Sequence, residues 1–205
     1  MSDYLVRVRF ANELHWVTEF VTPSHPHVQS RAEALRHDIA QCYFWVSDYV
    51  LYPLCAHADE HEMFAFKNML HLKAKEYWQF PAETLGWMDH NGWCYEDCDG
   101  QAILLCSLLR TFLPATDVYV GLGGRFELEH AWVRIRKNGI WYVLDTTLDE
   151  VLPLWSIYEK NPYNLYAYFN DQEAVEVVKG TFAILYEGVR GSLLIAGIDK
   201  RDKRL

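Results

Sequence analysis

The sequence has little positive charge and no long apolar run. Of its 205 residues, 19 are Lys or Arg and 28 are Asp or Glu, which gives a formal net charge of −9 with histidine neutral. This balance disfavours nucleic acid and anionic membrane surfaces as partners, since both call for a basic face. No stretch of about 18 uncharged apolar residues is present, so the sequence predicts no membrane-spanning helix.

Paired cysteines and targeting signals are missing as well. The five cysteines are an odd number without a paired framework, and the first residues lack the charged-then-apolar pattern of a signal peptide. Both absences favour a reducing compartment, so we expect a cytoplasmic protein. One of the thiols could then serve chemistry rather than a disulfide. The cysteines are Cys42, Cys55, Cys94, Cys98 and Cys106.

The chain also lacks internal repeats, low-complexity stretches and Gly/Ser linkers, which predicts a single domain over 1–205. Hydrophobic residues make up 51% of the sequence and aromatic residues 15%, enough apolar surface to form a core and to exclude a disordered chain. Within this domain we expect an N-terminal helical part over about 1–76, a catalytic core over about 77–186 and a solvated C-terminal tail over 187–205.

Hydrophobic periodicity predicts helices in the first half of the chain and strands in the second, which is the α+β class. We expect a helix over 30–51 with Ser30 as its N-cap, and a second helix over 59–77. A third helix over 98–112 is apolar nearly all round, as in a helix buried on most sides. The expected strands are 117–122, 130–136, 140–145, 174–178 and 181–186, with 80–97 as loop containing a short helical turn at 82–87, and 153–169 as a connection.

Cys98 stands at the start of the buried helix. Free backbone N–H groups and the helix dipole favour a thiolate at that position, and the same N–H groups could hold an oxyanion. Glu96, Asp97 and Asp99 are close in sequence and oppose ionisation of the thiol. A catalytic Cys98 therefore needs a base nearby.

The strongest hairpin signal in the sequence, Asn-Gly at 138–139, brings a histidine and a carboxylate together. If these two residues form the whole turn, His130 and Asp145 lie on the same face as diagonal neighbours, about 7–8 Å apart at Cα. A carboxylate that orients a histidine, beside a thiol at a helix N-terminus, is the Cys-His-Asp arrangement of nucleophilic catalysis. A three-residue loop would place the two on opposite faces. The competing interpretation of the same spacing is an ordinary surface histidine beside an aspartate at a strand end.

The motifs at 77–85, 97–110, 130–133 and 141–147 resemble those of the transglutaminase-like superfamily. Residues 97–105 (DCDGQAILL) and 107–110 (SLLR) are similar to its nucleophile helix, with a Cys, an Ala four residues on and a leucine-rich run. Residues 130–133 (HAWV) resemble its His-Ala-Trp strand, and 141–147 (WYVLDTT) its Trp-x-x-x-Asp strand. Residues 77–85 (YWQFPAETL) resemble an upstream segment of microbial members. The three motifs occur in the family order Cys, His, Asp.

The resemblance implies a papain-like α+β core in which a buried nucleophile helix packs on an antiparallel sheet. It assigns Cys98 as nucleophile, His130 as base and acid, and Asp145 as the residue that orients the imidazole. For the oxyanion we expect the Cys98 N–H, with Gln79 or Trp78 as a side-chain donor. The implied activity is that of a cysteine peptidase, amidase or transglutaminase-type enzyme on protein or peptide amides, without a metal or other cofactor.

Two features depart from the family pattern. Microbial relatives often carry a second acidic residue where this chain has Gly100. Their glycine-rich approach to the nucleophile is replaced here by residues 92–96 (GWCYE), which adds Cys94. Both changes leave the three motif residues intact and bear on how a substrate reaches the thiol.

Two other interpretations compete with the enzyme. His90, Cys94 and Cys98 follow one another at four-residue spacing, with a histidine pair over 57–61, and thiolate and imidazole ligands suit zinc, although this spacing lacks the tight knuckle of structural zinc sites. The second alternative is a non-catalytic module that uses the same fold to bind peptides. An intact Cys-His-Asp set favours the enzyme over this module.

Overall fold

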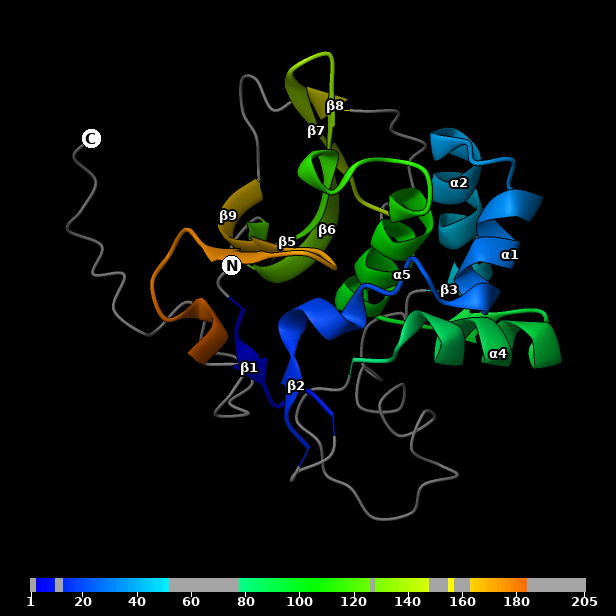
Figure 1. Cartoon of the computed structure of the whole chain (residues 1–205), viewed down its shortest axis with the longest axis horizontal. Coiled ribbons are helices and arrows are strands. Elements are labelled where there is room, and N and C mark those ends of the chain that lie inside the picture. Colours follow the sequence, from blue (N-terminus) through cyan, green and yellow to red (C-terminus); the bar gives the residue numbers. More distant parts are fainter. Residues whose placement is uncertain are drawn as a thin grey trace.

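The computed structural model describes residues 3–9, 13–51, 78–125, 128–147, 155–156 and 163–183. Helices gather at one side of the molecule and an antiparallel sheet at the other (Figure 1). This is the α+β arrangement that the sequence predicts. The predicted helix over 59–77 and the predicted tail over 187–205 lie outside the described residues.

The main sheet runs in the order β10-β9-β5-β6-β7-β8, and every neighbouring pair of these described strands is antiparallel. Apolar side chains from β5, β6 and β9 form one face of the core, because strand residues alternate between the two faces of the sheet. The strands are β5 (Val118–Arg125), β6 (Leu128–Lys137), β7 (Ile140–Leu144), β8 (Trp155–Ser156), β9 (Tyr163–Phe169) and β10 (Ala174–Glu176).

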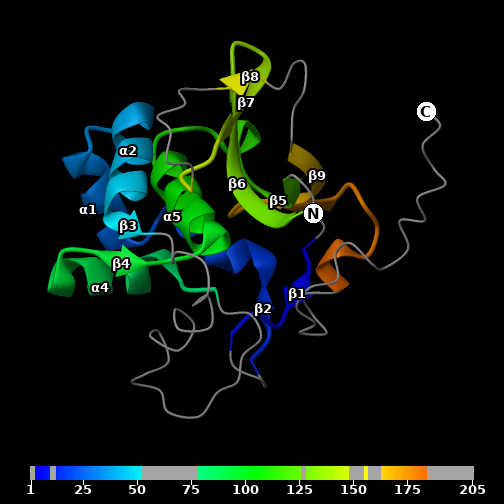
Figure 2. The same ribbon diagram turned by 180° about the vertical axis from the view of Figure 1, so that it is seen from behind.

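Helix α5 (Cys98–Arg110) lies between this sheet and the remaining helices (Figure 2). It contacts β5 and β6 on one side and α1, α2 and α4 on the other. Residues 99–109 are all buried, as the nearly uniform apolar sequence of this segment predicts. The surrounding helices are α1 (Pro26–Ala34), α2 (Ile39–Tyr49) and α4 (Pro81–Asn91).

Two short strand pairs complete the framework. β1 (Leu5–Val6) and β2 (His15–Trp16) pair antiparallel and lead into the 3₁₀ helix η1 (Val17–Phe20). β3 (Val50–Leu51) and β4 (Cys94–Tyr95) pair in parallel, so the end of α2 is joined to the loop that precedes α5. A second 3₁₀ helix, η2 (Ala115–Asp117), connects α5 to β5.

The helix predicted over 30–51 is two helices, and Ser30 is not its N-cap. The first begins at Pro26 after His25, whose Nδ1 accepts from the backbone N–H of His27. Arg36 and His37 then adopt left-handed backbone conformations that interrupt the helical path. Asp38 starts the second helix, because its carboxylate accepts from the N–H of the first turn.

Three further expectations about local structure are corrected. The helical turn predicted at 82–87 is the longer helix α4, which Gly92 ends in a left-handed conformation. The connection predicted over 153–169 contains the strands β8 and β9, and β9 pairs with the glycine-rich strand β5 near the middle of the sheet. Residues 181–183, predicted as part of a strand, are helical.

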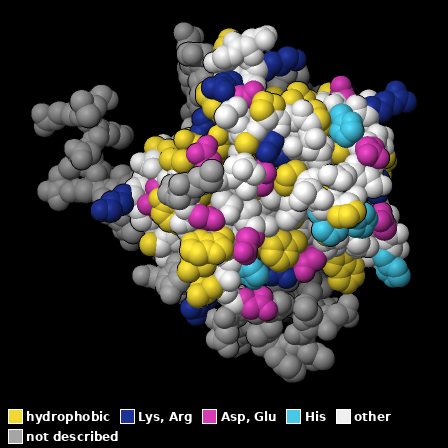
Figure 3. All heavy atoms as spheres, viewed as in Figure 1, with side chains coloured by type: hydrophobic (Ala, Val, Ile, Leu, Met, Phe, Trp, Pro, Cys, Tyr) yellow, Lys and Arg dark blue, Asp and Glu magenta, His cyan; other side chains and the backbone are white. Residues whose placement is uncertain are grey.

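Among the described residues, no helix is long and apolar enough to cross a membrane. On the face in Figure 3, Lys and Arg side chains lie scattered among acidic and apolar ones and form no continuous basic patch within the described part.

Candidate active site

Cys98 is the first residue of α5 and is partly exposed. Asp97 is the N-cap, and its Oδ1 accepts from the N–H of Gly100 at 3.5 Å. Backbone N–H groups in the first turn of a helix have no partner within the helix, so they favour negative charge in front of it. The thiol therefore stands at the helix end that favours negative charge, at the position in the helix that the sequence predicts.

Hydrogen bonds hold the loop before Cys98 to β3 and to the first turn of α5. The N–H of Glu96 donates to the carbonyl of Leu51 at 3.1 Å, which continues the β3–β4 pairing toward the thiol. The buried amide of Gln101 donates to the carbonyls of Val50 at 2.9 Å and of Glu96 at 3.2 Å. These bonds fix the entry of the chain into α5, and with it the position of Cys98.

Glu96 places a carboxylate beneath the first turn of α5. Its side chain is 1% exposed, and its Oε1 accepts from the hydroxyl of Thr84 at 2.8 Å. A Cβ atom at position 100 would lie 2.1 Å from Oε2 of Glu96, so any larger residue would displace this carboxylate from its present position. The departure at Gly100 thus has a structural reason within this chain.

In the upstream segment, residues 78–85 anchor the start of α4. Glu83 accepts from the backbone N–H of Phe80 at 2.7 Å and so stabilises the start of α4. Its two oxygens also accept from the guanidinium of Arg9, each at 2.8 Å. Arg9 donates in addition to the carbonyl of Trp78 at 2.9 Å, which ties α4 to the N-terminal segment.

The hairpin prediction is confirmed. Asn138 and Gly139 have positive φ angles of 54° and 78°, as a strand-matched two-residue turn requires, and Lys137 pairs with Ile140. This register places His130 and Asp145 on one face. Nε2 of His130 lies 2.7 Å from Oδ2 of Asp145.

The Asp145 carboxylate accepts from several donors. Its Oδ1 accepts from the N–H of Thr147 at 3.0 Å and from the Thr147 hydroxyl at 2.7 Å. Its Oδ2 accepts from the Tyr163 hydroxyl at 2.7 Å as well as from His130. The Arg125 guanidinium lies 3.8 Å from the same oxygen. Only 1% of the Asp145 side chain is exposed, against 10% for that of His130.

This environment sets the charge and tautomer of the pair. Burial alone would raise the pKa of Asp145, but the hydrogen bonds from His130, Tyr163 and Thr147 and the charge of His130 outweigh it and lower the pKa to about 2. The carboxylate is therefore ionised at neutral pH and can only accept hydrogen bonds. Nε2 of His130 must then carry the proton of the shared bond, which leaves Nδ1 as the free position of the neutral ring.

Tyr43 connects this site to the helices. Its hydroxyl, from α2, donates to the backbone carbonyl of Asp145 at 2.9 Å. The bond holds the chain just after β7 against the helix that also packs on α5. Burial and the negative charge of Asp145 raise the pKa of Tyr43 to about 12, so its hydroxyl stays a donor across the neutral range.

Aromatic rings support His130 on the same face of the sheet. The Trp132 ring centroid lies 6.3 Å from that of His130 and 4.9 Å from that of Tyr163. Trp132 in turn lies against Gly121 and Gly123, where any Cβ would come within 2.9 Å of its ring. The glycines of β5 therefore make room for the Trp132 ring from β6. This packing fixes the plane of the Trp132 ring beside His130.

Trp78 and Gln79, the expected oxyanion donors, are both buried. The Trp78 ring stacks on Phe169 and meets Phe20 edge-on in the core. Its Nε1 finds no hydrogen-bond partner among the described residues. The role of these two donors and the approach of Cys98 to His130 stay predictions.

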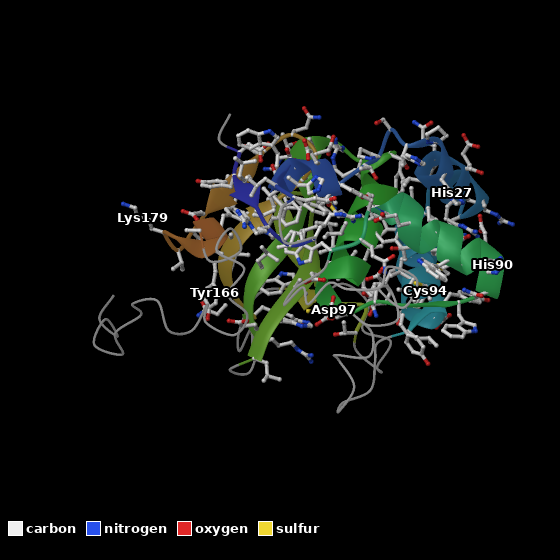
Figure 4. The ribbon with its side chains drawn as sticks, turned by 90° about the horizontal axis from the view of Figure 1, so that it is seen from below. His27, His90, Cys94, Asp97, Tyr166 and Lys179 are labelled. Atoms are coloured by element: carbon white, nitrogen blue, oxygen red, sulfur yellow. The ribbon has the colours of Figure 1, made fainter. Side chains whose placement is uncertain are left out.

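The described residues contain no group of three or more His, Cys, Asp or Glu side chains that could hold a metal ion. Figure 4 shows His90 at the outer end of α4, away from Asp97 and the start of α5. The Cys94 thiol is buried and donates to the carbonyl of Tyr95 at 3.4 Å. Burial raises the pKa of this thiol, which keeps it protonated.

Sequence reasoning missed three residues of this site. Thr147 could have been found, because a Thr two residues after an Asp commonly donates back to its carboxylate. Arg125 and Tyr163 carried no signal, since each reaches Asp145 only through the order of the strands. Tyr163 lies on β9, in the segment predicted as a connection.

Among comparisons with known proteins, the one with solved structures finds similar folds. No family model matches the sequence, and no curated protein matches it. Among solved structures, Legionella pneumophila LapG is similar at 11% identity and a TM-score of 0.50, with 74% of each chain covered. A calcium-bound structure of the same protein gives the same identity and score over 73% of this chain and 76% of that one. The fold of this chain is therefore similar to that of the LapG structures. At this identity the likeness concerns the fold alone.

Proposed function

We propose that this protein is a thiol-dependent enzyme that cleaves or transfers acyl groups at protein or peptide amide bonds, with Cys98 as nucleophile, His130 as base and acid, and Asp145 as orienter. The observation that carries the proposal is the 2.7 Å hydrogen bond from Nε2 of His130 to the buried carboxylate of Asp145. A histidine held in one tautomer by an ionised carboxylate is suited to accept a proton from a thiol.

Two further observations support it. Cys98 is the first residue of a helix that packs on β6, the strand that carries His130. The structural neighbour LapG is a transglutaminase-like cysteine protease, and a shared fold is compatible with the same class of reaction.

The chemistry follows from the free Nδ1 of His130. Nδ1 accepts the thiol proton of Cys98, and the thiolate attacks the carbonyl carbon of the substrate amide. The oxyanion that forms accepts from the Cys98 N–H and a neighbouring donor. When the C–N bond breaks, the leaving amine takes the proton from His130, and a thioester remains on Cys98. Water gives hydrolysis or deamidation, and an amine gives a crosslink, when either one attacks that thioester with His130 again acting as base.

The first test needs no knowledge of the substrate. Iodoacetamide alkylation of the native protein, followed by peptide mapping, measures the reactivity of Cys98 across pH. We expect fast alkylation at Cys98 near neutral pH, and His130→Gln should slow it. The matched control is His90→Gln, because His90 is exposed and far from α5. Equal rates in the three proteins would overturn the proposal.

The second test measures turnover. A mixture of peptides that contain glutamine side chains and ordinary peptide bonds is incubated with the protein, and thioesters on Cys98 are identified by mass spectrometry. We expect Cys98→Ser to form none, and His130→Gln to slow acylation by about 100-fold or more. If no adduct forms with any amide while peptides still bind, the chain is a peptide-binding module and not an enzyme.

A further inference from the structure

Tyr163 supplies a second hydrogen bond to the carboxylate that holds His130, and the role argued for it rests on the proposed function. Two donors share Oδ2 of Asp145, namely Nε2 of His130 and the hydroxyl of Tyr163, each at 2.7 Å. A carboxylate oxygen that accepts from two donors at this distance has both lone pairs engaged. The direction and strength of the His130 bond therefore depend on whether the second donor is present.

Tyr163 reaches this oxygen across two intervening strands. It lies on β9, whereas His130 lies on β6 and Asp145 directly follows β7. β5 and β6 stand between β9 and β7, and Tyr163 pairs with Arg125 of β5.

Gly123 lets the chain of β9 lie close to β5 directly after Tyr163. A Cβ at position 123 would lie 2.0 Å from the carbonyl oxygen of Asn164 and 2.9 Å from the Trp132 ring. The β5–β9 pairing shifts register between Leu122 and Gly123. An irregularity of this kind redirects the following side chains, and here it accompanies the turn of Tyr163 toward Asp145.

The surroundings keep the phenol in place and protonated. The Tyr163 ring packs on Trp132 at 4.9 Å, and the Arg125 guanidinium lies 5.6 Å from its centroid. Burial and the negative charge of Asp145 raise the pKa of the Tyr163 phenol. The hydroxyl thus remains a donor over the whole range in which the histidine would work.

We infer that Tyr163 is a positioning residue for the proposed reaction: its hydroxyl shares the carboxylate oxygen that holds His130 and so sets the orientation and strength of the His130–Asp145 hydrogen bond. Its hydroxyl acts on the histidine through Asp145, and its ring centroid lies 6.2 Å from that of His130. Without this hydroxyl, the negative charge on Oδ2 is shared with one donor fewer, so the hydrogen bond from His130 becomes stronger. Its direction is then less fixed, because the second lone pair of Oδ2 no longer has a partner.

Tyr163→Phe tests this, since it removes one oxygen atom and keeps the ring that packs on Trp132. The matched control is Tyr168→Phe on the same strand, whose ring stacks near Arg134 instead. The first readout is the low-field proton NMR signal of the His130–Asp145 hydrogen bond, identified by its loss in His130→Gln and Asp145→Asn. We expect it to move further downfield in Tyr163→Phe and to stay in place in Tyr168→Phe.

The second readout is the alkylation rate of Cys98 by iodoacetamide. We expect Tyr163→Phe to lower it by about 3- to 10-fold, less than His130→Gln does, because a positioning group contributes only part of the effect of the base. An unmoved NMR signal together with an unchanged rate would overturn the role of Tyr163. If the rate is insensitive to His130→Gln as well, the proposed function itself fails, and the two failures are thereby distinguished.

Discussion

The depressed pKa of Asp145 predicts a specific loss of stability in acid, which Asp145→Asn should remove. In the folded protein this pKa is about 2, against an ordinary value of 3.8. The unfolded state therefore binds the proton first as the pH falls. The stabilisation is complete above pH 3.8 and is lost as the pH falls from there toward 2.

The magnitude follows from the two pKa values. The pKa in the folded protein lies nearly two below the ordinary value. This difference corresponds to about 2 kcal/mol of unfolding free energy once the stabilisation is fully lost. Between pH 5 and pH 3 the linkage relation gives a loss of about 1 kcal/mol from this one group. Other carboxylates titrate in the same range, so the quantity to compare is the difference between the wild type and the variant.

Urea unfolding at pH 5 and pH 3, followed by tryptophan fluorescence, measures this difference. The wild type should lose about 1 kcal/mol more than Asp145→Asn between the two pH values. Asp48→Asn is the matched control, because Asp48 is exposed on α2 and should leave the acid loss as in the wild type. Parallel losses in the wild type and Asp145→Asn would refute the reasoning that the donors around this carboxylate hold it ionised.

Three shorter predictions concern packing and reactivity. Gly123→Ala should destabilise the protein by about 2 kcal/mol or more in urea unfolding, because its Cβ would overlap the carbonyl of Asn164, and an unchanged midpoint would contradict the close approach of β5 and β9. Gly139→Ala should cost about 1 kcal/mol in the same assay, since the turn holds this residue at a φ of 78° with open space around it, so that only the backbone is strained. At neutral pH, iodoacetamide should label Cys98 and leave the buried Cys94 unlabelled in the native protein, and peptide mapping that finds Cys94 labelled at a similar rate would show that its burial is transient.

Short-range sequence patterns were enough to predict where Cys98 lies and that His130 and Asp145 share a face of the sheet. An aspartate cap followed by an apolar run starts a buried helix at Cys98 whatever lies around it. The Asn-Gly pair at 138–139 allows positive φ angles at two successive residues, and the period of two along a strand then places His130 and Asp145 on one face. In both cases the rule acts between residues that are close in the chain or joined by a single turn.

Other parts of the helical region were decided by contacts that a local pattern does not contain. The apolar positions over 30–51 continue across the break at Arg36 and His37, so periodicity alone joined two helices into one. Helix α4 looked like loop because Pro81, Gly86 and Gly92 fall within or beside it. It is held by the bonds of Glu83 to Arg9 and to the N–H of Phe80.

The sequence by itself therefore determined the fold class, the position of the thiol and the pairing of the histidine with the carboxylate. The tertiary structure alone decided what surrounds that carboxylate. The segment around Tyr163 contains prolines and asparagines, and its polar and apolar residues do not alternate as in a typical strand. Tyr163 nevertheless lies in the sheet, because Gly123 on β5 lets the backbone of β9 approach. Its hydroxyl meets Asp145 only once strands distant in sequence are placed in the order β9-β5-β6-β7. Strand order depends on the packing of the whole core, and no short-range pattern encodes it.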